Sequence, residues 1–179
     1  MTENRIIVIY KSSTGFTKKY AEMIAEEIEC TLADYKTITA EILSEYDTVV
    51  FGSRAHAGMI DGYKKAKELF QKSKAHKFIL FVTGATPNAA EEIITEFWKQ
   101  NLTAGELSEI PHFYMQSGLC YEKMSFGDKL MMKAASLIIK NKKDKNSYDK
   151  EFERASTGSY DISSKTYIEP LVSFLKTSL

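Results

Sequence analysis

Short apolar runs alternate along this chain with amphipathic stretches. The apolar runs have no polar residue at every second position, which is typical of strands buried on both faces of a sheet. Turn-forming residues bound each run. The pattern predicts strands at Ile6–Tyr10, Thr48–Phe51, Phe78–Val82 and His112–Met115, with a weaker strand at Leu32–Ile38.

Between these strands, apolar residues recur every three or four positions, as they do on one face of a helix. In Thr17–Glu29, for example, Tyr20, Ile24 and Ile28 lie four positions apart. The same spacing predicts helices at Asp61–Lys74, at Asn88–Gln100 after Pro87 in a first turn, in a short segment closed by Ser44–Tyr46, and at Ser164–Leu179.

Strands that alternate with helices of this length form βαβ units with right-handed crossovers. Five such strands predict an α/β fold, a three-layer doubly wound sandwich around a parallel sheet. The chain of 179 residues has no internal repeat, low-complexity tract or linker. We therefore expect a single domain over residues 1–179.

One segment, at about residues 120–157, does not fit the alternation, because it is far longer than a typical connection. It begins after the last predicted strand and precedes the last helix. Residues 121–150 carry eight Lys against four acidic residues, a net charge of +4 in a chain whose total is zero. The segment is therefore predicted to be an insertion with its own role.

Within the insertion, Phe126–Ile139 has an apolar stripe with Lys129 and Lys133 beside it. One interpretation is an amphipathic helix packed on the core, with a solvated basic end. The other is a lid or docking surface, where Met gives an adaptable apolar face and Lys meets carboxylates or anionic headgroups. The pattern leaves both open.

Composition excludes several classes of function. The 24 basic and 24 acidic residues balance, so no overall field favours nucleic acid. No window reaches the roughly 18 apolar residues of a membrane span, and no early apolar region precedes a cleavage site. Cys30 and Cys120 match no metal or redox spacing. We expect a cytoplasmic protein.

The turn after the first strand is rich in hydroxyl side chains. Ser12–Thr17 reads S-S-T-G-F-T and leads directly into a predicted helix. Backbone N–H groups at a helix N-terminus, together with hydroxyls, can bind a phosphate without a cation, and Gly15 permits close approach. Taken alone, the same residues can simply form a turn and a helix cap.

The run from Ile6 to Ala21 resembles the flavodoxin signature, in which S/T-x-T-G-x-T separates an apolar strand from a helix. The resemblance implies a flavodoxin-like sheet with strand order 2-1-3-4-5, counted along the chain, and FMN as cofactor. In that family this loop binds the FMN phosphate. The implied phosphate residues are Ser12, Ser13, Thr14, Gly15, Phe16 and Thr17.

Two further Gly-containing loops would then flank the flavin ring, and neither holds an aromatic residue after Phe51. The implied ring contacts are Ser53, Arg54, Ala55, His56, Ala57 and Gly58, then Thr83, Gly84, Ala85 and Thr86. His56 would stack on the ring, tune its potential or be a solvated loop residue. Arg54 would neutralise reduced flavin or pair at the surface.

The chain departs from electron-carrier flavodoxins, which are acidic and stack the ring between aromatic side chains. Gly52–Gly58 and the insertion are instead similar to the menaquinone-dependent protoporphyrinogen dehydrogenase branch of the superfamily. That resemblance implies a porphyrinogen substrate and a quinone acceptor, whereas a carrier would have a redox-protein partner. The apolar and basic surface of Phe126–Lys145 would suit peripheral contact with the inner face of the membrane.

Three hypotheses about function follow. The first is an FMN-dependent oxidoreductase that takes electrons from a reduced substrate such as protoporphyrinogen and passes them to a quinone-type acceptor. The second is a flavodoxin-type carrier that shuttles electrons between redox partners. The third is a module that keeps the fold without flavin. No catalytic side chain and no metal site are assigned.

Overall fold

The computed structural model describes residues 4–145, 149, 153 and 158–178. Its centre is a parallel sheet in the order β2-β1-β3-β5-β6. These strands are the five that the sequence predicts, so the order 2-1-3-4-5 is confirmed. Their bounds are β1 Ile6–Tyr10, β2 Thr31–Asp34, β3 Thr48–His56, β5 Lys77–Gly84 and β6 His112–Gln116.

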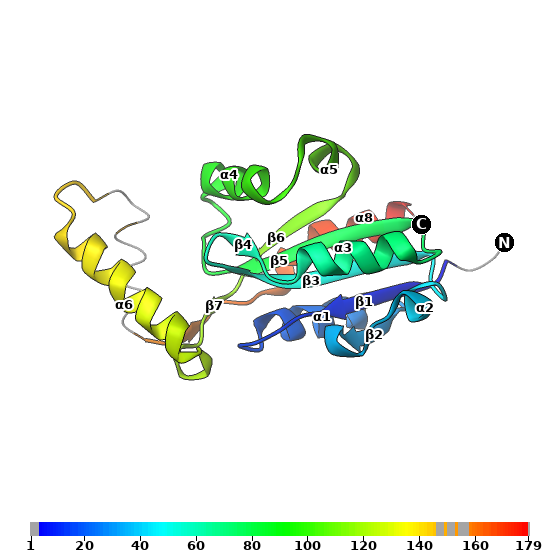
Figure 1. Ribbon diagram of the computed structural model, residues 1–179, viewed down its shortest axis with the longest axis horizontal. Helices are drawn as coiled ribbons and strands as arrows, with labels where there is room; N and C mark the ends of the chain where they lie inside the picture. The colour runs from blue at the N-terminus through cyan, green and yellow to red at the C-terminus, as the bar shows by residue number, and fades with distance from the viewer. Residues whose placement is uncertain (1–3, 146–148, 150–152, 154–157, 179) are drawn as a thin grey trace.

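Helices cover both faces of the sheet, which gives three layers (Figure 1). Two helices pack on one face, α1 (Phe16–Glu27) and α8 (Glu169–Ser178). The other face carries the rest of the flanking helices. These are α2 (Ala40–Leu43), α3 (Tyr63–Lys72), α4 (Glu91–Asn101) and the short α5 (Ala104–Glu109), which the hydrophobic pattern did not predict.

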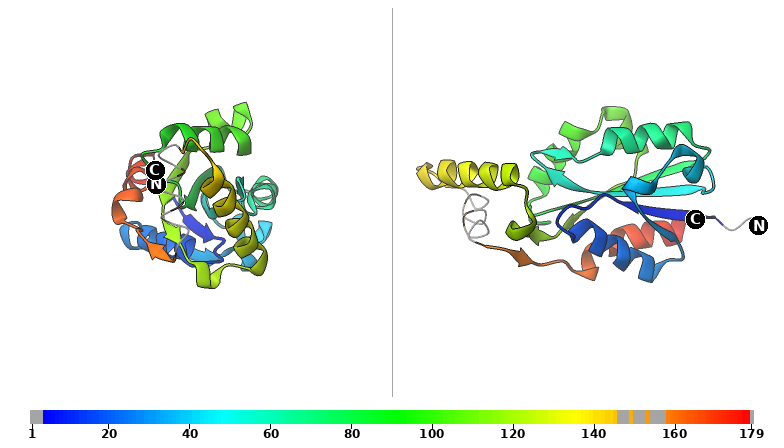
Figure 2. Two further views of the ribbon diagram at one scale, coloured as in Figure 1. Left: turned by 90° about the vertical axis from the view of Figure 1, so that its left-hand side faces the viewer. Right: turned by 60° about the horizontal axis from the view of Figure 1, so that its bottom comes forward.

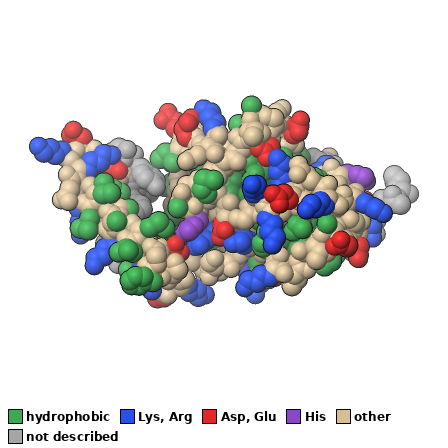
Figure 3. Space-filling view, viewed as in Figure 1, with side chains coloured by type: hydrophobic (Ala, Val, Ile, Leu, Met, Phe, Trp, Pro, Cys, Tyr) green, Lys and Arg blue, Asp and Glu red, His purple; other side chains and the backbone are tan. Residues whose placement is uncertain are grey.

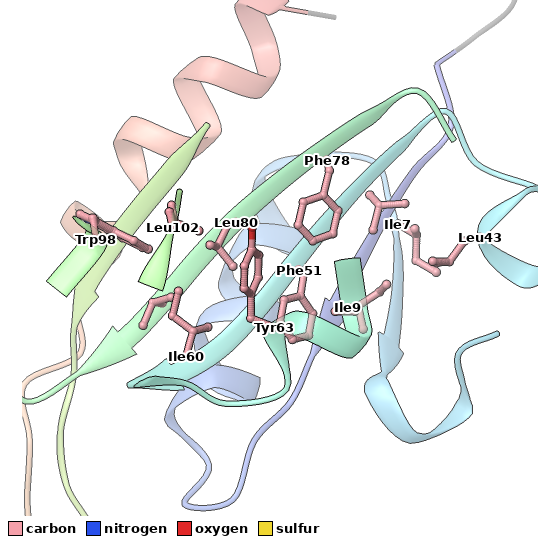
Figure 4. Close-up of a cluster of buried hydrophobic side chains, with 13 residues drawn as sticks. Ile7, Ile9, Leu43, Phe51, Ile60, Tyr63, Phe78, Leu80, Trp98 and Leu102 are labelled. Carbon is pink, nitrogen blue, oxygen red and sulfur yellow. The ribbon is translucent and has the colours of Figure 1, made fainter. Parts of the chain in front are cut away.

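Two separate cores hold the layers together. Under α1 and α8, the side chains of Tyr20, Ile24 and Leu171 are fully buried against the sheet. The opposite core joins aromatic and aliphatic side chains of the sheet to α3 and α4 (Figure 4). In that core the ring of Phe78 lies against those of Phe51 and Phe70. Apolar runs without alternation are thus explained by burial on both faces.

The third strand is longer than predicted. Instead of ending at Phe51, β3 continues to His56 and turns back antiparallel into β4 (Met59–Ile60). Both turn residues have positive φ, 50° at Ala57 and 79° at Gly58, as a two-residue hairpin with the right-handed twist of its strands requires. A segment predicted as a loop is therefore a β-hairpin.

Other bounds shift more modestly. The fourth predicted strand extends through Thr83 and Gly84, and α4 begins at Glu91, so Pro87 lies in the preceding loop instead of in the first helical turn. The sequence pattern predicts that the last helix begins at Ser164. Instead, Lys165–Tyr167 forms a separate 3₁₀ turn, η3, and α8 begins at Glu169. Residues 35–38, predicted as the end of the second strand, contain the 3₁₀ turn η1 (Tyr35–Thr37).

The insertion lies beyond the carboxyl edge of the sheet (Figures 1 and 2). Its stem is a two-stranded antiparallel ribbon of β7 (Gly118–Leu119) and β8 (Tyr160–Asp161). The 3₁₀ turn η2 (Tyr121–Lys123) and the helix α6 (Phe126–Asn141) follow β7. Residues 146–148, 150–152 and 154–157 of the predicted insertion are outside the described residues. No described helix is both long and apolar enough to span a membrane.

Of the two interpretations of the stripe, the structure does not bear out the helix packed on the core, because α6 has no buried residue. Its apolar stripe faces solvent, with Phe126 84 % and Ile138 70 % exposed. Figure 3 shows hydrophobic side chains gathered along this helix. An apolar helix face left open in this way indicates a contact surface.

We expect Gly52→Ala to destabilise the fold, because a Cβ there would lie 2.0 Å from Cζ of the buried Phe81. Overpacking of this kind costs about 1–3 kcal/mol of unfolding free energy. Chemical denaturation measures the change in unfolding free energy. Gly105→Ala in α5 is the matched control, since no atom of the described residues outside that helix's own backbone and the chain neighbours lies within 4 Å of the new Cβ. Phe81→Leu should recover part of the loss, and equal stability of the two Ala variants would contradict the prediction.

Candidate functional site

The turn between β1 and α1 presents a set of backbone donors that the protein does not use. Gly15 has φ +103° and precedes α1 without capping it through a side chain. Within the described chain, the N–H groups of Phe16, Thr17 and Lys18 have no acceptor. Unpaired amides at a helix N-terminus carry the positive end of the helix dipole. The turn therefore has the free donors and the partial positive charge that an anion requires.

Hydroxyl groups surround these amides. Ser12 Oγ accepts a hydrogen bond from the Gly15 N–H at 3.1 Å, which holds the turn closed and leaves the hydroxyl proton of Ser12 available. Ser13 is exposed and Thr14 is half-buried. These side chains can add donors to those of the backbone.

Three predicted site residues meet in a buried polar contact where the sheet's central strands end. Thr17 Oγ1 lies 2.9 Å from Thr83 Oγ1, and Thr83 Oγ1 lies 3.5 Å from the Ser53 carbonyl oxygen. Thr17 and Thr83 are each only 2 % exposed. The structure thus brings the three predicted loops together, but the hydroxyls of Thr17 and Thr83 hold the strands and α1 to one another.

The ring-flanking segments are held by two Asn side chains that the sequence reasoning missed. Asn101 at the end of α4 accepts from Ile60 N–H at 2.8 Å and donates to the Gly58 carbonyl at 2.9 Å, which fixes the hairpin. Asn88 and Gln116 exchange backbone-to-side-chain hydrogen bonds of 3.1 and 2.9 Å, which fixes the loop after β5. Only the T-P-N turn around Asn88 offered a signal, since Asn is a turn residue.

A cavity of about 1070 Å³ opens beside these segments. Ala55, Ala57 and Ala85 from the predicted ring loops line one side. The other sides carry apolar residues of α4 and of the insertion, among them Ile93, Phe97, Leu119 and Ile162. Small residues next to the sheet edge and larger apolar residues around it suit a flat, mostly apolar ligand.

Arg54 and His56 meet the insertion at Asp128, in the first turn of α6. His56 Nε2 lies 2.6 Å from Asp128 Oδ1, and Arg54 Nη1 lies 3.5 Å from Asp128 Oδ2. On the other side, Asp61 joins Arg54 Nε at 3.5 Å and Lys11 Nζ at 2.7 Å. Arg54 and His56, two of the predicted ring contacts, are thus partners of carboxylates. Their contacts with Asp128 link β3 to α6.

The hydrogen bond with His56 lowers the pKa of the Asp128 carboxyl below its usual range. Partial burial opposes the shift, and the hydroxyl of Ser125, which also caps α6, adds to it. Asp128 was not predicted as a site residue. The S-x-x-D sequence of Ser125–Asp128 marks a helix start, but nothing local indicates its partners on β3.

The arrangement defines a doubly wound α/β protein with unused amides in its first turn and a cavity at the carboxyl edge of its sheet. The chain belongs to the flavodoxin domain family, whose model matches residues 7–148. No curated protein sequence matches the chain.

Several solved structures are similar to it at low identity. A flavodoxin from the domain Archaea has 16 % identity and a TM-score of 0.41, covering 85 % of this chain and 93 % of its own. Flavodoxin 1 from Bacillus cereus has 18 % identity and a TM-score of 0.39, with coverage of 84 % and 98 %. A flavoprotein in complex with FMN from Lactobacillus acidophilus has 17 % identity and a TM-score of 0.41, with coverage of 64 % and 93 %. The family assignment rests on the family model and not on these.

Asp128→Asn should loosen α6, because Asn loses the charge that attracts Arg54 and the strong acceptor for His56. Hydrogen exchange in Phe126–Lys133 should become faster at neutral pH, with β3 unchanged. Acidic pH should also make hydrogen exchange in Phe126–Lys133 faster in the unaltered chain. Since the folded pKa of Asp128 is lowered, the stabilisation is complete above its unfolded pKa and is lost as pH falls through the folded value. The exposed Asp144→Asn is the control, and equal exchange in both variants would contradict the prediction.

Proposed function

We propose that this protein is an FMN-binding oxidoreductase. Membership of the flavodoxin domain family supports the cofactor. The observation that carries the proposal is the set of unused amides in Phe16–Lys18, which face an open turn next to Ser12–Thr14. A phosphate monoester matches those donors in charge and geometry. FMN, when bound, would supply reversible uptake of one or two electrons.

At the proposed phosphate site, some residues would contact the phosphate and others would position the loop. The amides from Phe16 to Lys18 and the hydroxyls of Ser12, Ser13 and Thr14 would hold the phosphate. Thr17 would contribute its amide, because its hydroxyl already bonds Thr83. In this proposal Thr17 and Thr83 position the loop, and their side chains do not contact the cofactor.

At the ring end, Ser53–Gly58 and Thr83–Thr86 would border the flavin. The small side chains of Ala55, Ala57 and Ala85 leave room for a planar ring, and backbone N–H groups there would face its polar edge. Arg54 and His56 would act on the ring by electrostatics, moderated by Asp128, and neither is proposed to stack on it.

The cavity favours an enzyme over a simple carrier. At about 1070 Å³ it is at the upper end of the range for small-ligand pockets, so a substrate has room beside the ring. We propose protoporphyrinogen or a related reduced compound as electron donor and a quinone as acceptor, in keeping with the branch that Gly52–Gly58 and the insertion resemble. The alternative, electron exchange with a redox protein, is supported by the family and by the open face of α6.

We propose that α6 is the docking surface for the acceptor. Phe126, Leu130 and Leu137 lie on its exposed face, and helical spacing places Lys129, Lys133 and Lys140 along one border of that face. An apolar face with a basic border suits an anionic membrane surface that holds a quinone. Peripheral membrane contact through Phe126–Lys145 remains part of this proposal.

Titration of apoprotein with FMN, followed by flavin fluorescence, tests the cofactor. Ser13→Ala combined with Thr14→Val removes two hydroxyl donors and should weaken FMN binding about a hundredfold, at about 1.5 kcal/mol for each hydrogen bond to a charged group. Thr166→Val, on an exposed position of η3, is the control. The absence of any FMN uptake by the unaltered chain would refute the proposed function.

Anaerobic mixing separates the enzyme from the carrier. Protoporphyrinogen should bleach the flavin of the loaded protein, and menaquinone in anionic vesicles should restore its colour. Replacing Phe126 and Leu137 with Ser should slow reoxidation by vesicles several-fold because the apolar contact is lost, with no change for a water-soluble quinone analogue. Failure of protoporphyrinogen to bleach the flavin would favour a carrier or another donor, and equal rates for both proteins with vesicles would remove α6 as the docking surface.

A further inference from the structure

The insertion places one cation directly over the turn between β1 and α1. Lys123, the last residue of η2, has its Nζ 3.8 Å from the point where a Cβ on Gly15 would lie. Among the described residues, and apart from Gly15 and its chain neighbours, no other atom comes within 4 Å of that point. The ammonium group therefore stands at the open side of the turn, more than a hundred residues away along the chain.

Lys123 has no carboxylate within ion-pair distance among the described residues, unlike Lys11 and Lys19 on either side of the β1–α1 turn. Lys11 pairs with Asp61 at 2.7 Å, and Lys19 pairs with Asp161 at 2.6 Å. The ammonium of Lys123 instead lies beside Gly15, the residue just before the unused amides of Phe16–Lys18, which carry the positive end of the α1 dipole. Two positive groups that face one another across a gap are stabilised by an anion between them.

Hydrogen bonds hold the backbone of η2, which carries Lys123. In η2, the Tyr121 N–H donates to Ser159 Oγ at 2.8 Å, and the Lys123 N–H donates to the Cys120 carbonyl at 3.2 Å. Ser159 immediately precedes β8, and the pair between Lys19 and Asp161 ties β8 to α1. The stem of the insertion is thus docked on the helix whose N-terminus receives the anion, and it carries Lys123 with it.

We propose that Lys123 contacts the phosphate of the bound flavin nucleotide and makes the insertion stem part of the cofactor site. This inference rests on the proposed function and deepens it. A phosphate held from two sides, by the amides of α1 and by Lys123, would dock the stem more firmly on α1. Binding of a phosphorylated flavin and ordering of the stem are then coupled, and each strengthens the other. Riboflavin, which has no phosphate, would not be coupled in this way.

Binding of FMN and of riboflavin to Lys123→Met tests the contact. Methionine keeps the unbranched apolar side chain and removes the charge. FMN binding should weaken about five- to tenfold, as for loss of one partly exposed ionic hydrogen bond, and riboflavin binding should not change. The affinity for FMN should also depend less steeply on salt, and Lys123→Arg should restore most of it. Lys64→Met, an exposed lysine in the first turn of α3, is the matched control.

Hydrogen exchange gives a second, independent readout. In the unaltered protein, FMN should slow exchange in Gly118–Lys123 and Tyr160–Asp161, and riboflavin should not. In Lys123→Met the protection by saturating FMN should disappear in the stem and remain at α1. A thermal melt of the apoprotein checks that the variant folds normally.

The outcomes separate this inference from the proposed function. If the unaltered protein binds FMN and Lys123→Met binds it equally well with the same stem protection, Lys123 has no part in the site although the proposed function stands. If FMN and riboflavin bind the unaltered protein with equal affinity, the phosphate contact is also refuted. If the unaltered protein binds no FMN, both proposals fail.

Discussion

The parallel pairing of β1, β3 and β5 is the constraint on which the rest of the structure depends. Tyr10 lies opposite Gly52, and Gly52 lies opposite Phe81, so the three strands run side by side in the same direction. Their carboxyl ends therefore meet at one edge of the sheet, although more than seventy residues of chain separate the first from the last. The turn before α1, the β3–β4 hairpin and the loop after β5 become neighbours only through this pairing.

Electrostatics at that edge follow from the same arrangement. The N-terminus of α1 brings partial positive charge to one end of the site, and Arg54 brings a full charge to the other end. The insertion meets each end with a different group. Asp128 neutralises the β3 end through its pairs with Arg54 and His56, whereas Lys123 adds positive charge over the turn before α1. In the proposed function, the insertion would therefore sharpen the preference of the site for a ligand with an anionic tail.

Local sequence patterns predicted most of the fold, because burial on both faces of a sheet requires continuous apolar runs and burial of one helix face requires a repeat of three to four residues. They failed where distant contacts decide the structure. Ser53–His56 reads as a loop, yet pairing with β5 and with β4 extends β3 through it. The stripe of α6 reads equally well as a packed face, and only its position beyond the sheet edge leaves it exposed.

The sequence by itself determined the doubly wound fold, the hydroxyl-rich turn and the resemblance to flavodoxins, because each depends on residues close together in the chain. The tertiary structure alone decided which of these residues are free to bind. It joined the hydroxyls of Thr17 and Thr83 across sixty-six positions, and it gave Arg54 and His56 a carboxylate partner. It also placed Lys123 above Gly15. Hydrogen bonds and ion pairs act over a few ångströms in space whatever the separation in sequence, so no local pattern could reveal them.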